Sequence, residues 1–438
     1  MSGKLDKLIK ILLSSILFLL PWQTIYITKE NFLNGEKWQS GTLGFYATEG
    51  LLWLCAVLFI IWFYKKNKLR FTDYGLRITK QRIFILSLLL FTVYALLSTV
   101  WAINSDLAFQ HGRRIMEAAI LFLIILSGPL NFRQAALWFV AGAILPSVLG
   151  IYQFFAQSTF AASWLGLSHY PVWQAGSSVI STLDWGRWLR ASGPFPHPNI
   201  FGGYLVASLI FTFFLLAKEK KQTLLRVTIY GLLITTQLTA LFATFSRSAW
   251  LAFGVFIITY IIYNLSFIKK PNNKNYELRI TSYGLLIMTI LSIIFFPIVQ
   301  TRFSQETVNE IISTDERLDG YSEAGKIFKQ NIFFGVGAGN YTAAAYRLNP
   351  NLPGWTYQPV HNVPLLILTE LGIIGSALLI GVFISFIRLI PRHFYIIYGL
   401  LLLFDHYLFS SYTGLMLSAV FLSLIVKITS VVYNSREI

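Results

Sequence analysis

Twelve apolar stretches of bilayer-spanning length constrain the fold of this chain more than any other feature. They lie at 8–27, 43–64, 83–102, 115–130, 134–155, 199–217, 227–245, 249–268, 280–298, 361–387, 394–410 and 413–432. A membrane-spanning helix needs about 20 mostly apolar residues. Only 12% of the residues are charged, whereas soluble domains carry about 25%. We therefore predict an all-α polytopic membrane protein, with about twelve transmembrane helices in a single integral membrane domain over 1–438.

The basic side chains predict the orientation of these helices. A net charge of +16 would suggest nucleic acid as the partner of a soluble protein. With the N-terminus in the cytoplasm, the inner segments include KKNKLR, KEKKQ and KKPNNKNYELR, and they carry most of the basic residues. This distribution satisfies the positive-inside rule. The predicted partner of the chain is therefore a lipid bilayer, and no nucleic acid is expected.

Two of the predicted outer segments are long, at about 156–198 and 299–360. Long ordered loops usually carry function. The second one contains apolar residues at helical spacing, which predicts an amphipathic helix near 314–330 lying at the outer surface. Its predicted apolar face consists of Leu318, Tyr321 and Phe328. We therefore expect a large extracytoplasmic, periplasmic loop that contains an amphipathic helix.

Arginines in the predicted outer segments run against the positive-inside rule and call for another explanation. Arginine is suited to bidentate binding of phosphate oxygens. Arg247 is the sharpest case, because it lies in ATFSRSAW between two apolar runs that are almost without a loop. Two readings stay open for it: an interfacial anchor or an anion ligand in a cavity. The outer arginines are Arg113, Arg114, Arg187, Arg190, Arg247, Arg302, Arg317 and Arg347.

The segment ASGPFPHPNIFGG follows Arg187 and Arg190 and introduces an apolar run. Asn199 is expected to cap the helix, with Pro198 just outside it. The N-terminus of such a helix is itself an anion site. His197 is either a ligand or base, or an ordinary polar histidine of a loop.

His361 opens the apolar run VHNVPLLILTELGIIG, where the second long loop enters the membrane again. An imidazole at this position suits a general base, although a histidine at a helix end is an equally simple reading. Asn362 either orients it or caps the helix. Glu370 lies nine residues further on, and we expect it inside the bundle, paired or facing a cavity.

Several motif readings are excluded by what surrounds them. The stretch GVGAGNY at 335–341 has no GK[ST] and no preceding strand pattern, so it does not predict a nucleotide site. The predicted outer loops contain no DxD or HExxH, so no metal and no cofactor is expected. The lone cysteine, Cys55, rules out a disulfide framework within the chain.

Four motifs in order resemble the O-antigen ligase and polymerase superfamily. They are SGPFPHPNIFGGYL, ATFSRSAW, DERLDGYSEAGKIFKQNIFFGVGAGNY and HNVPLLILTELGIIG, and the resemblance covers about 185–385. It implies a metal-independent, inverting glycosyltransferase of the bacterial inner (cytoplasmic) membrane, with its site facing the periplasm or cell exterior. The implied donor is a glycan on undecaprenyl diphosphate, and the implied acceptor is lipid-linked or itself a glycan.

The resemblance also implies roles for particular residues. His361 would be the catalytic base, and Arg247, the arginine of the SR motif, would bind the diphosphate. The diphosphate would also be bound by Arg190, the basic residue before GPFPHPN. It would be bound as well by the arginine of the large outer loop, which is Arg317 with Arg302 as its competitor.

Two alternatives remain at this point. A polymerase of polysaccharide repeat units would share the motifs with a ligase, and nothing in the sequence separates the two. A membrane transporter of a bicarbonate-like solute would also fit many helices with polar interior residues. The long outer loops carrying arginine and histidine favour surface chemistry over transport.

Overall fold

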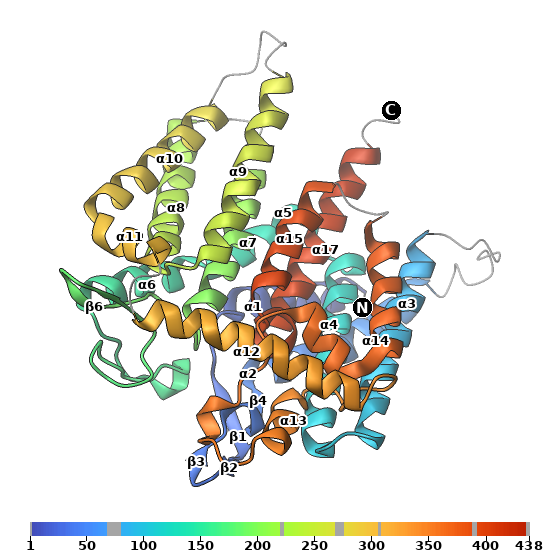
Figure 1. Ribbon diagram of the computed structural model, residues 1–438. Helices are drawn as coiled ribbons and strands as arrows, with labels where there is room; N and C mark the ends of the chain where they lie inside the picture. The colour runs from blue at the N-terminus through green and yellow to red at the C-terminus, as the bar shows by residue number, and fades with distance from the viewer. Residues whose placement is uncertain are drawn as a thin grey trace.

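The computed structural model describes residues 2–67, 80–219, 223–267, 276–304, 308–387 and 392–434, and it is mostly helical (Figure 1). The prediction of a helical membrane protein is confirmed. The helices are α1 (Ser2–Leu19), α2 (Ala47–Asn67), α3 (Lys80–Leu97), α4 (Ser105–Ser127), α5 (Phe132–Gly142), α6 (Ile144–Ala156), α7 (Pro198–Ala217), α8 (Leu224–Ala243), α9 (Arg247–Phe267), α10 (Tyr276–Ile294), α11 (Phe296–Ser304), α12 (Val308–Gln330), α13 (Tyr341–Leu348), α14 (Val363–Ile387), α15 (Arg392–Phe404), α16 (Tyr407–Ser410) and α17 (Tyr412–Asn434).

Seven helices of the described residues are long and apolar enough to cross a membrane. They become eight if α10 and α11, which meet at a bend of 86°, count as one span. Each of the twelve predicted stretches does hold a helix, but the count of about twelve spans is not confirmed. The physical reasons differ. α1 and α4 each carry four charged side chains, and α9 and α15 offer only shorter apolar segments, Arg247–Ile262 and Phe394–Phe404, among the described residues.

The centre of the bundle is formed by α7 and α17. Of the 20 residues of α7, 18 are buried, in agreement with a sequence that is apolar all round. α7 packs against α5, α8 and α9, while α17 packs against α4 and α16. Residues at the start of α7 are therefore held by the most enclosed element of the fold.

The described residues also form three small two-stranded antiparallel sheets at one end of the bundle, which an all-α prediction does not include. β1 (Ile25–Lys29) pairs with β4 (Leu43–Tyr46), β2 (Phe32–Leu33) with β3 (Glu36–Lys37), and β5 (Val179–Thr182) with β6 (Gly186–Leu189). Figure 1 shows β1–β3, α12 and α13 together at the end away from the C-terminus. We call this end of the bundle the site end.

The helix expected near 314–330 is α12, which spans Val308–Gln330. On its predicted apolar face, Leu318 is 60% exposed and Tyr321 is also exposed. The buried side instead carries Ala324 and Ile327, and α12 packs against α14. The periodicity therefore predicted a helix in this segment correctly, and the side of the helix that is buried in the structure is the side of Ala324 and Ile327.

α14 is a broken helix, and the glycine-rich stretch 335–341 fills its break. Gly372 has φ +66° and ψ −169° in the middle of the helix. Backbone polar groups freed at membrane depth need partners inside the protein. The amides of Val336 and Gly337 donate to the carbonyls of Thr369 (3.0 Å) and Glu370 (2.8 Å). The stretch 335–341 thus supplies hydrogen-bond donors to the backbone carbonyl groups at the break in α14. We call this stretch the glycine-rich plug.

Candidate functional site

The turn between α8 and α9 organises the cationic part of the site. Residues Thr244, Phe245 and Ser246 form this turn and are all buried, with φ +46° at Phe245. Carbonyls at the C-terminal end of a helix carry partial negative charge and attract cations. The Arg190 Nε donates to the Thr244 carbonyl over 2.8 Å, and the Arg302 Nε donates to the Phe245 carbonyl over 3.0 Å. The turn therefore fixes two buried guanidinium groups.

A cavity of about 180 Å³ opens beside this turn. Three guanidinium groups from three different elements line it: Arg247 at the start of α9, Arg302 on α11 and Arg317 on α12. The Arg247 Nη1 also donates to the Arg302 carbonyl over 3.3 Å. The rest of the lining consists of Asn199, Ser248, Leu251 and Phe404. The cavity thus has a cationic wall and two apolar side chains.

Asn199 connects the arginines to a carboxylate. Its Oδ1 accepts from Arg190 Nη2 over 2.7 Å, and its Nδ2 donates to Asp405 Oδ2 over 2.7 Å. The expectation that Asn199 caps the following helix is wrong. α7 begins at Pro198 and is capped by His197, whose Nδ1 accepts from the Asn199 backbone amide over 3.1 Å. Because His197 caps the helix, the Asn199 side chain can bind both Arg190 and Asp405.

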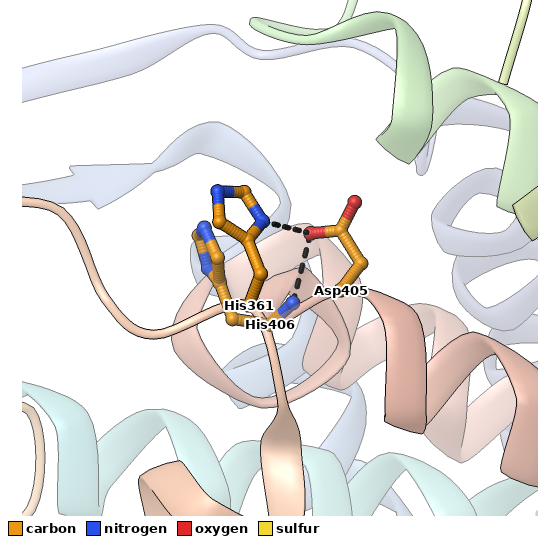
Figure 2. A group of neighbouring side chains, drawn as sticks. All are labelled: His361, Asp405 and His406. Atoms are coloured by element: carbon orange, nitrogen blue, oxygen red, sulfur yellow. Dashed lines mark hydrogen bonds and ion pairs between the residues drawn. The ribbon is translucent and has the colours of Figure 1, made fainter. Parts of the chain in front are cut away.

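Figure 2 shows the imidazole part of the site, where His361 and His406 stand beside Asp405. The His361 Nδ1 lies 3.7 Å from Asp405 Oδ1, and the same oxygen accepts from the His406 backbone amide over 2.8 Å. The run 394–410 was expected to be one helix. It ends instead at Phe404, and Asp405 and His406 form a break before α16, where the His406 amide donates to the Asp405 carboxylate.

The charges of this group follow from burial and contact. Burial raises the pKa of the Asp405 carboxyl, but the contact with His361 and the other nearby histidines outweigh it and hold this pKa below its usual range. Burial lowers the pKa of His406 to about 4. Burial, together with the charge of Arg190, lowers the pKa of His197 to about 3. At neutral pH Asp405 is therefore a carboxylate, and His197 and His406 are neutral imidazoles.

His361 is oriented as a general base would be. Its Nδ1 faces the Asp405 carboxylate, and a carboxylate at this nitrogen favours the tautomer with the proton on Nδ1. Nε2 then carries the lone pair. The His361 side chain is one-quarter exposed, so a reactant can approach it. The arrangement can accept a proton at one nitrogen while the carboxylate stabilises the charge that forms.

Three other expected site residues lie elsewhere or have structural partners. Arg187 on β6 donates to the Val172 carbonyl over 3.1 Å and ties down the preceding loop. Asn362 caps α14, since its Oδ1 accepts from the Leu365 amide over 2.9 Å. Glu370 accepts from the amides of Gly339 (2.7 Å) and Tyr341 (3.2 Å). None of these three lines the cavity.

Arg113 and Arg114, also among the outer arginines, belong to a separate cluster between α2 and α4. Arg113 pairs with Glu49 and, over 2.8 Å, with Glu117. The Arg114 Nη2 donates to the Gly44 carbonyl over 3.2 Å. Their charges are compensated there, so they add nothing to the cavity.

In the part of the chain that the structure describes, His361, Asp405 and His406 also form a group that could hold a metal ion. Their ligand atoms lie within 4.8 Å of one another. Tetrahedral zinc brings nitrogen and oxygen ligands to about 3.4 Å from each other, given bond lengths near 2.0–2.1 Å. The Asp405 carboxylate is already engaged by Asn199 and by the His406 amide. A metal would therefore require the side chains to close in and this carboxylate to release a partner.

Sequence reasoning missed Asp405. A signal existed, because a carboxylate and an imidazole adjacent in an otherwise apolar stretch of bilayer length mark a functional position. The stretch was counted as a span instead. Asp405 is buried and accepts from a residue 206 positions away, a contact that no local pattern reveals.

Comparison with models of protein families gives a match. The family described as O-antigen ligase matches residues 230–380, about a third of the 438 residues. No curated protein matches the chain. The matched segment contains Arg247, Arg302, Arg317 and His361, whereas Asn199 and Asp405 lie outside it.

Proposed function

Because this chain belongs to the O-antigen ligase-like superfamily, we propose that it transfers a glycan from undecaprenyl diphosphate to an acceptor sugar. The reaction would take place at the outer face of the bacterial inner membrane, without a metal ion and with inversion at the anomeric carbon. The site end would then face the periplasm or the cell exterior. Multiple apolar helices and the family match support a membrane enzyme of this general kind.

One observation carries the proposal: a cavity with three guanidinium groups lies next to an imidazole paired with a carboxylate. A diphosphate diester bears about two negative charges, and charge develops further on it as the glycosidic bond breaks. Arginines aimed at this charge stabilise it in the transition state. Leu251 and Phe404 in the same lining are suited to the first isoprene unit of a lipid carrier.

The proposed step is a single displacement. The acceptor hydroxyl oxygen attacks the anomeric carbon from the side opposite the diphosphate. The new glycosidic bond forms as the bond to the diphosphate oxygen breaks, and the leaving group keeps the electron pair. The hydroxyl proton passes to His361 Nε2, and Asp405 stabilises the imidazolium until the proton returns to solvent. General base catalysis of this kind contributes about 10²–10⁴-fold.

Arg190 has a positioning role in this scheme. Its guanidinium is held by the Thr244 carbonyl and by Asn199, so it orients the asparagine that in turn orients Asp405. Arg247, Arg302 and Arg317 contact the diphosphate directly. The first group of interactions prepares the base, and the second stabilises the leaving group.

The function can be tested with purified protein in liposomes, an undecaprenyl-diphosphate glycan and an acceptor, in the presence of EDTA. We expect release of undecaprenyl diphosphate with formation of a glycosylated acceptor. His361→Ala should lose this activity, while His169→Gln, an exposed histidine of the site end, should keep it. Release that requires added divalent ions, or that persists in His361→Ala, contradicts the proposal.

The choice of acceptor in this assay distinguishes a ligase from a polymerase. A ligase transfers to a lipid-linked sugar of another class than the donor, whereas a polymerase extends the repeat units of the donor itself. Product length on a gel distinguishes them, because one transfer per acceptor indicates ligation and a ladder indicates polymerisation. Solute flux without any release of lipid diphosphate would instead identify a transporter.

A further inference from the structure

The turn that joins β5 to β6 exposes apolar side chains that do not line the cavity. Leu183 at its tip is 88% exposed, and Trp185 is also exposed. The turn is well ordered, since the Trp185 amide donates to Thr182 Oγ1 over 2.9 Å and Gly186 takes φ +67°. An ordered turn that presents leucine and tryptophan to its surroundings needs a partner for them.

This turn is continuous with the exposed apolar surface of two neighbouring helices. Trp185 contacts the ring of Phe295, with ring centroids 6.1 Å apart, and Phe295 also packs against Phe155 at 6.2 Å. Phe155 lies at the end of α6, in a stretch that can cross the membrane, and it is exposed, as are Ile293 and Ile294 at the end of α10. The exposed apolar surface of the two helices thus runs directly onto the turn.

α11 extends the same surface along a different direction. It bends by 86° from α10 and packs against β5, as Figure 1 shows beside α6. One side of α11 is buried through Ile298 and Arg302, whereas Phe296 and Phe303 are 58% and 62% exposed. A short helix turned off the axis of its span, with an exposed aromatic side, has the character of an interfacial helix.

We propose that the β5–β6 turn and the exposed side of α11 form a membrane anchor that inserts into the headgroup region of the leaflet at the site end. Tryptophan favours this region of the bilayer. Interfacial helices bury their apolar side about 5–10 Å into the boundary between headgroups and acyl chains. The carboxylate of Asp184, exposed at the tip, keeps the turn at this depth and out of the hydrocarbon core.

The anchor sets the depth of the cavity. β6 ends at Leu189, directly before Arg190, and α11 carries Arg302. Both elements are short, so their seating in the headgroup region brings these two guanidinium groups to the level of lipid phosphates. Lipid is therefore the occupant of this surface, and a second copy of the chain is the competing one.

The anchor can be tested by spin labelling in liposomes of phosphatidylethanolamine and phosphatidylglycerol. Ala replaces the native Cys55, which is buried, and a single label is attached at Leu183→Cys. Asp184→Cys serves as a second position, and Glu36→Cys, exposed on β3 at the site end, is the matched control. Collisions of the label with oxygen report lipid, and collisions with a water-soluble nickel chelate report solvent.

We expect oxygen collisions to exceed nickel collisions at 183 and 184, and the reverse at 36. Nickel collisions at 183 and 184 as frequent as those at 36 would overturn the proposal. Dipolar broadening between labels at 183, which increases with the protein-to-lipid ratio, would overturn it as well, because it would show a second copy on this surface.

Discussion

Asn199 and Asp405 are 206 positions apart in the sequence, yet the Asn199 Nδ2 donates to Asp405 Oδ2 over 2.7 Å. The contact joins the start of the central helix α7 to the break between α15 and α16. Since Asn199 Oδ1 accepts from Arg190, the amide links a cation on one side to the partner of His361 on the other. An amide is the side chain that can donate to a carboxylate and accept from a guanidinium at once.

The first prediction concerns the carboxylate in this chain of contacts. Asp405→Asn should lower kcat by about 10²–10⁴-fold with little change in KM for the donor, because Asp405 acts through His361 and does not line the cavity. The readout is steady-state kinetics of lipid diphosphate release. Glu36→Gln, an exposed acid on the same end, is the control. A change confined to KM would instead place Asp405 in donor binding.

The second prediction concerns the shape of a cation. Arg247→Lys keeps the charge but loses the planar pair of donors that matches phosphate oxygens. A charge-assisted hydrogen bond contributes about 1.5–3 kcal/mol, so kcat/KM should fall about 10–100-fold. Arg347→Lys, on the exposed side of α13, should change it little. Equal activity of the two lysine variants would show that Arg247 is an interfacial anchor only.

The sequence predicted best those features that depend only on residues close to one another in the chain. About 20 consecutive apolar residues form a helix in a bilayer whatever their neighbours, so the runs at 199–217 and 227–245 became α7 and α8. Arginines on the side with fewer basic residues stood out for an equally local reason. Arg247, Arg302 and Arg317 do line one cavity, and their roles in catalysis remain predictions.

Other features depend on contacts between distant segments. Glu370 accepts from the backbone amides of Gly339 and Tyr341, and the residues next to position 370 in the sequence do not predict these contacts. The break in α14 at Gly372 is likewise stabilised by a loop about 35 residues earlier, so its sequence reads as one continuous helix. The cap of α7 is His197, two positions before the predicted Asn199. The Asn199 side chain instead donates to Asp405, which is distant in the sequence.

The third prediction is a loss of stability in acid. The folded-state pKa values of His197 and His406 are lowered to about 3 and about 4, against about 6.5 in an unfolded chain. Between these values the unfolded chain binds more protons. The stability is therefore fully present above about pH 6.5 and decreases as the pH falls, by up to about 2.7 kcal/mol per pH unit for two histidines.

The measurement is the Tm in detergent at pH 8 and at pH 5, where we expect a lower value at pH 5. His406→Gln removes one of the two buried imidazoles, so the difference in Tm between the two pH values should become smaller. His169→Gln, an exposed histidine, is the control and should leave the difference unchanged. An equal Tm at both pH values would contradict the burial of neutral imidazoles at this site.

The fourth prediction concerns the broken helix α14. A Cβ on Gly372 would lie 2.2 Å from the Phe333 carbonyl oxygen, and φ there is +66°. Gly372→Ala should therefore lower the free energy of unfolding by more than about 2 kcal/mol, since backbone strain and a steric conflict add. Gly381→Ala is a matched control in the same helix, because its Cβ would meet nothing within 4 Å. Alanine there should be neutral or stabilise by up to about 1 kcal/mol, as judged by Tm in detergent. If both variants melted alike, the glycine-rich plug would not be holding α14 in its broken form.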